Sequence, residues 1–289
     1  MSFIPPVVIT PELASRLESA EALHLARQVQ ICAQLRPELG AHIVHAAGGV
    51  AAFTTGEYGR KLNHVTGFGL GASATGNDLI ALENAYAKLG LVPEIDLCPF
   101  VSDDVLKILA TRNYAVNAFS NTYVTAVPGI DTISPLDSKI KIDRLSPAGG
   151  EDFFAASVAG FAKQRPDRPA ALIEILARIA IARKDSRLYV ARIDGQIAGS
   201  AGLALIDLPD GPVAYLYIAS TLPAFRGRGV QQALIQARLV DARRAGFEIA
   251  SITARTDTAS ARNASRSGFA LAYTKASFAL RLTGSASEK

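Results

Sequence analysis

The chain has 289 residues, 49% of them hydrophobic and 19% charged, which is typical of a globular protein with room for two domains of moderate size. Its net charge of +4 is divided unevenly: residues 1–138 hold 8 Lys/Arg and 13 Asp/Glu (net −5), whereas residues 139–289 hold 22 and 13 (net +9). Cys32 and Cys98 form no disulfide, metal or redox pattern, and no signal peptide is evident, which disfavours a secreted protein. No apolar run approaches the roughly 20 residues needed to span a bilayer. We therefore expect a cytoplasmic protein.

The first half alternates between helical and β-prone segments. Thr10-Pro11-Glu12 predicts a helix start, with an N-cap, a proline at the first helical position and an early acid. Apolar residues then recur with a helical period through Ala26. The other elements expected in this half are strands at 42–47, 50–55, 63–68 and 94–98, helices at 77–89 and 102–110, and a β-prone segment at 114–127. Residues 128–138 contain two prolines and a glycine, which predicts a linker.

The second half predicts a longer alternation of strands and helices. Its expected elements are a strand at 140–145, helices at 151–162 and 169–183, strands at 187–194, 197–205 and 213–220, a helix at 229–245, a strand at 248–254, a helix at 259–267 and one or two strands within 269–282. Both halves contain strand, helix, strand, helix and strand at similar spacing, with 20 residues from Glu94 to Tyr114 and 21 from Glu248 to Phe269. This indicates a diverged internal duplication, with chance likeness between two α/β domains as the alternative.

The most informative segment is a strand followed by a glycine-rich turn and a long helix. The turn reads Arg226-Gly227-Arg228-Gly229-Val230-Gln231. A helix start of this kind favours a bound phosphate, because its N–H groups are unpaired and the helix dipole attracts an anion. The glycines let the backbone come close to the phosphate. The alternative is a tight β–α connection whose arginines are solvated.

In this context the segment resembles the GCN5-related N-acetyltransferase (GNAT) superfamily. The family signature, Gln/Arg-x-x-Gly-x-Gly/Ala, is matched by Arg226 and Gly229, whereas Gln231 departs from its last position. The resemblance extends over residues 140–282 in the family's order of elements. It implies an α/β (α+β) GNAT fold, a mixed and mostly antiparallel sheet flanked by helices, in two tandem domains at 1–132 and 139–283. The first would be a degenerate copy without the cofactor loop.

The resemblance also implies a cofactor site. In the family the fourth strand splays from the fifth and its backbone pairs with the pantetheine arm of acetyl-CoA, which corresponds to Ile218, Ala219 and Ser220. The pyrophosphate would meet the N–H groups from Arg226 to Gln231, namely those of Arg226, Gly227, Arg228, Gly229, Val230 and Gln231. Ordinary sheet pairing is the alternative for Ile218–Ser220.

A further contact comes from the helix after the fifth strand. An Asn that touches CoA in many members corresponds to Asp257, so Ser260 or Asn263 on the next helix is expected to replace it. Each of the two also suits an ordinary surface position on a capped helix.

The catalytic residues are less determined. The tyrosine that protonates the thiol in many members corresponds to Ala264, which leaves Tyr273 as a substitute candidate or a half-buried strand tyrosine. Where some members carry a base Glu, this chain has Tyr215 and Tyr217, which face one side of the sheet and either line the acceptor site or pack under a helix. All four histidines lie in the first half, so unless that half folds over the site, the base must be a carboxylate, a tyrosine or water.

The first half is expected to shield the sheet and to wall the acceptor cleft. Its turn Gly67-Phe68-Gly69-Leu70-Gly71 occupies the loop position but lacks the arginine, so a structural role is favoured over a dinucleotide site. Its net charge of −5 suits a cationic amine. His42 and His45 would face opposite sides of a strand, so no metal is expected.

Three functions are compatible with these patterns. The first is an N-acetyltransferase that moves an acetyl group from acetyl-CoA to a primary amine of a small molecule or peptide. The second is a catalytically silent protein that binds acyl-CoA and acts through a partner. The third, nucleic-acid binding by the basic half, is disfavoured because its arginines are scattered. The sequence does not distinguish a monomer from a homodimer.

Overall fold

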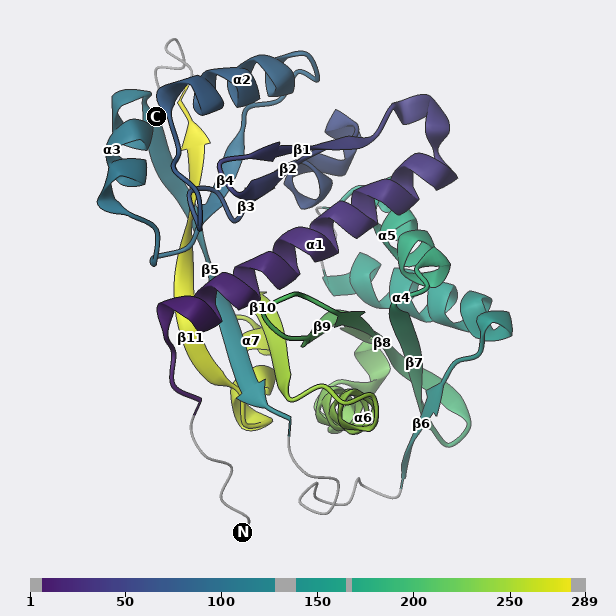
Figure 1. The fold of residues 1–289 in the computed structure, drawn as a ribbon. Helices are drawn as coiled ribbons and strands as arrows, with labels where there is room; N and C mark the ends of the chain where they lie inside the picture. Colours follow the sequence, from purple (N-terminus) through teal and green to yellow (C-terminus); the bar gives the residue numbers. More distant parts are fainter. Residues whose placement is uncertain (1–6, 128–138, 165–167, 282–289) are drawn as a thin grey trace, which may run out of the picture.

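The computed structural model describes residues 7–127, 139–164 and 168–281, and these form a single eleven-stranded sheet flanked by helices (Figure 1). The strand order is β1-β2-β3-β4-β11-β5-β10-β9-β8-β7-β6. The expected α/β architecture with a mixed, mostly antiparallel sheet is confirmed. The predicted linker at 128–138 lies outside the described residues.

The first half begins with a long helix and continues with short strands. Its elements are α1 (Pro11–Leu35), β1 (His42–Ala46), β2 (Gly49–Phe53), the 3-10 helix η2 (Gly56–Leu62), β3 (Val65–Thr66), α2 (Gly76–Ala87), β4 (Glu94–Leu97), α3 (Asp103–Thr111) and β5 (Tyr114–Ala126). The predicted cap of α1 is present, because the Thr10 side chain accepts a hydrogen bond from the Leu13 N–H at 3.2 Å. The strand expected at 63–68 is much shorter, since η2 precedes it and Gly67, with φ +75°, ends it.

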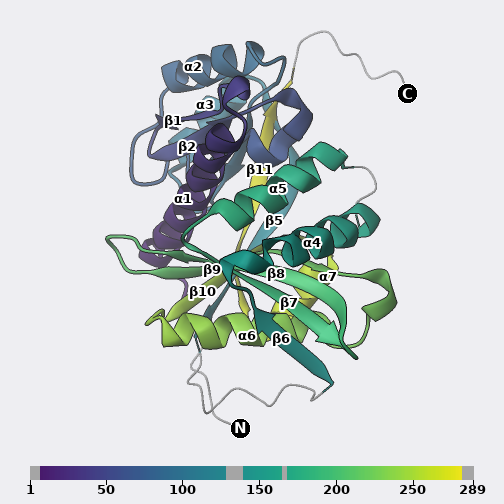
Figure 2. The ribbon, with the colours of Figure 1, turned by 90° about the vertical axis from the view of Figure 1, so that its right-hand side faces the viewer.

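The second half follows the predicted order closely. Its elements are β6 (Ile140–Arg144), α4 (Gly150–Gln164), α5 (Ala170–Ala182), β7 (Ser186–Ile193), β8 (Gln196–Ile206), β9 (Val213–Thr221), α6 (Val230–Arg244), β10 (Ile249–Arg255), α7 (Ala259–Arg266) and β11 (Ala270–Leu280). The final segment, expected as one or two strands, is one strand. Figure 2 shows α4 and α5 on one side of the second-half strands and α6 on the other.

The two halves exchange their last strands. β5, from the first half, lies between β10 and β11 and is antiparallel to both. β11, from the second half, lies between β5 and β4. Each half therefore needs a strand from the other to continue its sheet, and the segments predicted as separate domains share one sheet.

Helix α1 joins the halves a second time. It runs diagonally across the front of the molecule (Figure 1) and packs on β2 of the first half, on β9 of the second and against α5. Buried residues of α1, including Leu25 and Val29, share an apolar cluster with Leu176 and Ile179 of α5. The first half is thus fixed over the sheet of the second, where it can contribute side chains to a site there. Within the described residues, no helix has both the length and the apolarity needed to cross a bilayer.

Candidate functional site

The sheet opens between its two parallel neighbours, β9 and β10. They pair only at Ala250 with Ala214 and at Ser251 with Tyr215. β9 then continues to Thr221 and β10 to Arg255 without pairing each other. The backbone edge of β9 beyond Tyr215 is therefore free to bind an extended ligand in the manner of an added strand.

A bulge in β9 accompanies this divergence. The register with β8 shifts between Ser200 and Gly202, and Ile218 has φ +45°, which is unusual for a β-branched residue. A Cβ atom on Gly202 would lie 2.8 Å from the Tyr217 ring and 2.9 Å from Ile218 Cγ2, so a glycine is needed opposite the bulge. Strained, locally supported backbone of this kind is typical of functional sites.

The three strand residues predicted to meet the cofactor are not equivalent. The Ser220 carbonyl faces β8, because a Cβ on Gly199 of β8 would lie 2.6 Å from its oxygen. The Ser220 side chain is fully buried beneath α4. Because hydrogen-bonding edges alternate along a strand, Ala219 presents its backbone groups on the open side. Ile218 sits at the bulge itself.

The predicted phosphate loop stands at the end of β9. Gly227 and Gly229 have φ +75° and +81°, residues 226–229 are exposed, and no side chain caps the start of α6. Gln231, the departure from the family pattern, donates from Nε2 to Thr221 Oγ1 at 2.7 Å and so ties the helix start to the end of β9. The loop presents an open, positively charged helix N-terminus, which suits an anion.

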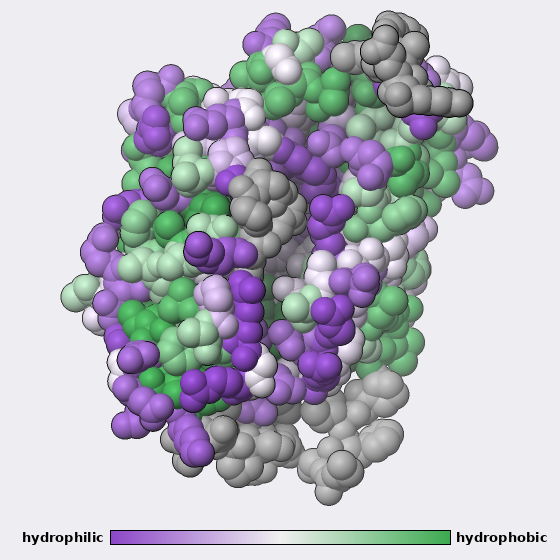
Figure 3. Space-filling view, turned by 180° about the vertical axis from the view of Figure 1, so that it is seen from behind, coloured by the Kyte–Doolittle hydropathy of each residue, from purple (hydrophilic) through white to green (hydrophobic). Residues whose placement is uncertain are grey.

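The rear face is hollowed along the middle of the molecule, in the region where Figure 1 shows β9 and β10 diverging (Figure 3). On α7, Ser260 is exposed and Asn263 is half-buried, whereas Ala264, at the expected acid position, is fully buried in the core. Another hollow, lined by Asp257, Ala261, Arg262 and Ser265, lies on the flank of α7 opposite Ser260 and Asn263.

On the front side, α1 covers the two strand tyrosines. The His24 ring lies 4.6 Å from the ring centroids of both Tyr215 and Tyr217. The Arg183 guanidinium donates to His24 Nδ1 at 2.9 Å, and burial together with this cation lowers the His24 pKa well below its usual value. Because arginine can only donate, His24 is neutral and carries its proton on Nε2. His24 is therefore not assigned as a base.

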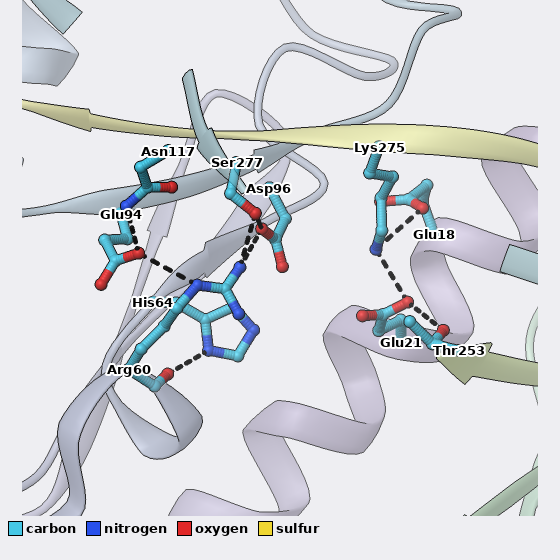
Figure 4. A network of polar contacts seen from close by, with 10 residues as sticks. All are labelled: Glu18, Glu21, Arg60, His64, Glu94, Asp96, Asn117, Thr253, Lys275 and Ser277. Carbon is cyan, nitrogen blue, oxygen red and sulfur yellow. Dashed lines mark hydrogen bonds and ion pairs between the residues drawn. The ribbon is translucent and has the colours of Figure 1, made fainter. Parts of the chain in front are cut away.

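Beside the tyrosines, α1 places two acids over the exchanged strand (Figure 4). Lys275 of β11, which is fully buried, lies 3.2 Å from Glu18 Oε1 and 2.8 Å from Glu21 Oε2. Burial raises the Glu18 pKa to about 6. Burial acts on Glu21 in the same direction, but the charge and hydrogen bond of Lys275 outweigh it and lower that pKa.

Tyr273, the candidate acid, belongs to this cluster. It is 5% exposed, and its hydroxyl donates to Glu18 Oε1 at 2.8 Å. Burial first, and the Glu18 charge second, raise the Tyr273 pKa far above its usual value. Its proton is thus directed to a buried carboxylate and not toward the divergence of β9 and β10.

Sequence reasoning missed Glu18, Glu21 and His24. Their signal was three polar residues at intervals of three on the apolar face of a helix. Nothing local indicated which strand that face would cover. Within the described residues, no three His, Cys, Asp or Glu side chains converge as a metal site.

The corresponding loop of the first half is built differently. Thr75 and Asp78 form a capping box that occupies the start of α2 and places a carboxylate there. A Cβ on Gly69 would lie 2.6 Å from Val105, so the loop packs closely against α3 at this position. These contacts favour the structural interpretation of Gly67–Gly71.

The comparisons with known proteins agree with this geometry. Residues 151–269 match the model of the acetyltransferase (GNAT) family. A GCN5-related N-acetyltransferase from Kribbella flavida has 16% identity and a TM-score of 0.66 over 93% of this chain and 96% of its own. A GCN5-related N-acetyltransferase from Sphaerobacter thermophilus has 14% identity and a TM-score of 0.56 over 96% and 95%.

A Drosophila protein has 12% identity and a TM-score of 0.53 over 96% of this chain and 98% of its own. At such identities these likenesses establish the fold, and they extend over both halves. No curated protein matches the sequence.

Proposed function

We propose that this chain, whose residues 151–269 form a domain of the acetyltransferase (GNAT) family, moves an acetyl group from acetyl-CoA to a primary amine of a small molecule or peptide. The observation that carries the proposal is the divergence of β9 and β10 after Tyr215 and Ser251, next to an uncapped helix start with two arginines. An open strand edge suits the amides of a pantetheine arm, and the basic helix start suits a pyrophosphate.

In this proposal each part of acetyl-CoA has a partner. The free edge at Ala219, flanked by Ile218 and Ser220, pairs with the pantetheine arm. The loop from Arg226 to Gln231 supplies backbone N–H groups and two guanidinium groups to the pyrophosphate. Ser260 and Asn263 lie on α7, next to β10, and among the described residues the Asn263 amide has no partner, so it is available to a ligand.

The proposed reaction is a direct transfer. The amine nitrogen attacks the thioester carbonyl carbon, and an N–C bond forms while the C–S bond breaks. The thiolate leaves with CoA and takes up a proton, and the proton lost from the ammonium passes to solvent. The chain contributes by holding the two reactants together and excluding alternative geometries.

The alternative function is a catalytically silent acyl-CoA-binding protein. Two observations favour it: Ala264 occupies the position of the usual acid, and the Tyr273 hydroxyl is engaged by Glu18. Release of the CoA thiol that depends on an added amine separates the two functions, because a silent protein binds acetyl-CoA without releasing the thiol.

The cofactor site is tested by calorimetric titration with acetyl-CoA. We expect wild type to bind, and Arg226→Ala to bind about 10-fold more weakly through loss of a charge-assisted contact. Gly229→Glu should abolish binding, because it forces a side chain onto φ +81° and adds a negative charge at the helix start. Arg243→Ala is the matched control, since this exposed arginine lies at the opposite end of α6.

Each outcome has a clear meaning. Weak or absent binding in the two loop variants, with wild-type affinity in Arg243→Ala, supports the loop as the pyrophosphate site. Folded wild-type protein that gives no heat with acetyl-CoA refutes both the enzyme and the silent binder.

A further inference from the structure

We infer that Glu21, on helix α1 of the first half, binds the ammonium group of the acceptor. This inference rests on the proposed function, because it assigns the amine side of the same site. No family motif indicates this residue, since it lies outside the matched segment at 151–269. It reaches the site only because α1 crosses from one half to the other (Figure 1).

The first argument is position. Thr253 of β10 lies two residues beyond Ser251, the last residue that pairs with β9. Its hydroxyl donates to Glu21 Oε2 at 2.9 Å, a contact between residues 232 positions apart. The Glu21 carboxylate is therefore held at the start of the divergence, where a thioester at the inner end of an added pantetheine strand would lie.

The second argument is that half of this carboxylate is unused. Oε2 takes both the Thr253 hydroxyl and the Lys275 ammonium, whereas Oε1 has no hydrogen bond among the described residues and points away from both groups in Figure 4. The Glu21 side chain is 12% exposed, compared with 1% for Glu18. Glu18 Oε2 is fully buried and has no hydrogen-bond partner among the described residues. Of the two acids, only Glu21 can accept a hydrogen bond from a ligand.

The third argument is charge. Glu18 and Glu21 share the single cation Lys275, so the three groups carry one uncompensated negative charge when both acids are ionised. The charges of Lys61 and Arg60 also act on Glu21, but neither side chain forms an ion pair with it. A buried unbalanced charge is unfavourable, and an acceptor ammonium would balance it.

Glu21 is a binding group rather than a base. Its lowered pKa keeps it ionised at neutral pH, which favours an ion pair with an ammonium but makes it a weak proton acceptor. The class of acceptor that follows is an amine protonated at neutral pH. A neutral acceptor, such as an alcohol or an aniline, would leave the carboxylate uncompensated.

The test is steady-state release of the CoA thiol with three amines, n-butylamine, spermidine and a lysine-containing peptide, at saturating acetyl-CoA. Glu21→Gln should raise the KM of each accepted amine about 10- to 100-fold through loss of one charge-assisted hydrogen bond, and leave the KM for acetyl-CoA within about 2-fold. Glu21→Asp should restore part of the loss. Glu18→Gln removes the same charge one turn away but keeps the Glu21 carboxylate and its unused oxygen, so it should raise the amine KM less than Glu21→Gln does.

Thr253→Val provides a second variant that keeps Lys275 paired. It should raise the amine KM about 3- to 10-fold, because Glu21 loses one of the two groups that orient it. An unchanged amine KM in folded Glu21→Gln and Thr253→Val, with intact acetyl-CoA binding, would overturn the inference and leave the proposed function standing. Thiol release with none of the three amines, despite bound acetyl-CoA, would overturn the inference and the amine acceptor together.

Discussion

At the scale of single residues, the site depends on glycines at positions where neighbouring atoms leave no space for a side chain. Gly160 of α4 is one: a Cβ there would lie 2.3 Å from Ser220 Oγ, so α4 approaches β9 this closely only without a side chain. On β8, Gly202 likewise has no space for a Cβ, because it lies opposite the bulge at Ile218. Together these glycines let the sheet and helix enclose a strand whose other edge stays open.

Another residue-scale feature is His64, which is buried beside Arg60 and Asp96 (Figure 4). Its Nδ1 lies 3.0 Å from the Arg60 carbonyl oxygen, to which it donates in the neutral form. Burial lowers the His64 pKa from 6.5 to about 4. Between pH 6.5 and about 4, His64 is therefore protonated in the unfolded chain but neutral in the folded chain. The free energy of unfolding falls as the pH is lowered through this range.

His64→Asn, which keeps a donor for the carbonyl, should reduce this loss. Between pH 7 and pH 5 we expect its unfolding free energy to fall by about 2 kcal/mol less than that of wild type. Urea denaturation of both proteins at the two pH values measures the difference. The comparison is needed because Glu18, with its pKa raised to about 6, contributes with the opposite sign between pH 4.5 and 6. Equal losses in the two proteins would contradict the assignment.

At the scale of elements, the exchange of β5 and β11 makes the halves interdependent. β5 pairs with β10 along its C-terminal part and with β11 along most of its length. Removing the first half would expose the edges of β10 and β11 and uncover the apolar residues beneath α1, such as Tyr215 and Ile206. Exposed strand edges and apolar faces favour aggregation.

We therefore predict that residues 139–289 do not fold alone, although they contain the whole matched segment. Expressed by themselves they should be insoluble or lack a cooperative thermal transition by circular dichroism. Coexpression with residues 1–132 as a separate chain should restore a soluble 1:1 complex, seen by size-exclusion chromatography. A monomeric, cooperatively unfolding second half would show that the exchanged strand is dispensable.

At the scale of the whole molecule, two similar halves have different surfaces. The start of α6 is open, with exposed Arg226 and Arg228, whereas the start of α2 is closed by Thr75 and Asp78. The first half instead supplies α1, whose polar residues reach the divergence in the second half. In the proposed function, cofactor recognition lies in one half and acceptor recognition involves both.

This arrangement predicts one acetyl-CoA per chain. Calorimetry should give a stoichiometry near one, and Asp78→Ala, which removes the carboxylate at the start of α2, should leave it unchanged because Gly69 still packs on Val105. Two sites in wild type would show that the first half has kept a cofactor site of its own.

The sequence by itself determined the features that depend on neighbouring residues. The start of α1 at Thr10, the order of elements in the second half and the turn before α6 are set by caps, periodicity and glycines within a few positions, so they could be predicted. The role of the loop residues in binding acetyl-CoA remains a prediction from resemblance.

Only the tertiary structure decided which strand pairs with which and what α1 covers. β5 and β11 are both long, antiparallel and β-prone, so either could have closed its own half, and no local pattern distinguishes that arrangement from the exchange. The contact of Thr253 with Glu21 likewise joins residues 232 positions apart. Such contacts depend on the packing of the complete chain, because a strand edge or helix face accepts many partners and burial of the whole core selects one.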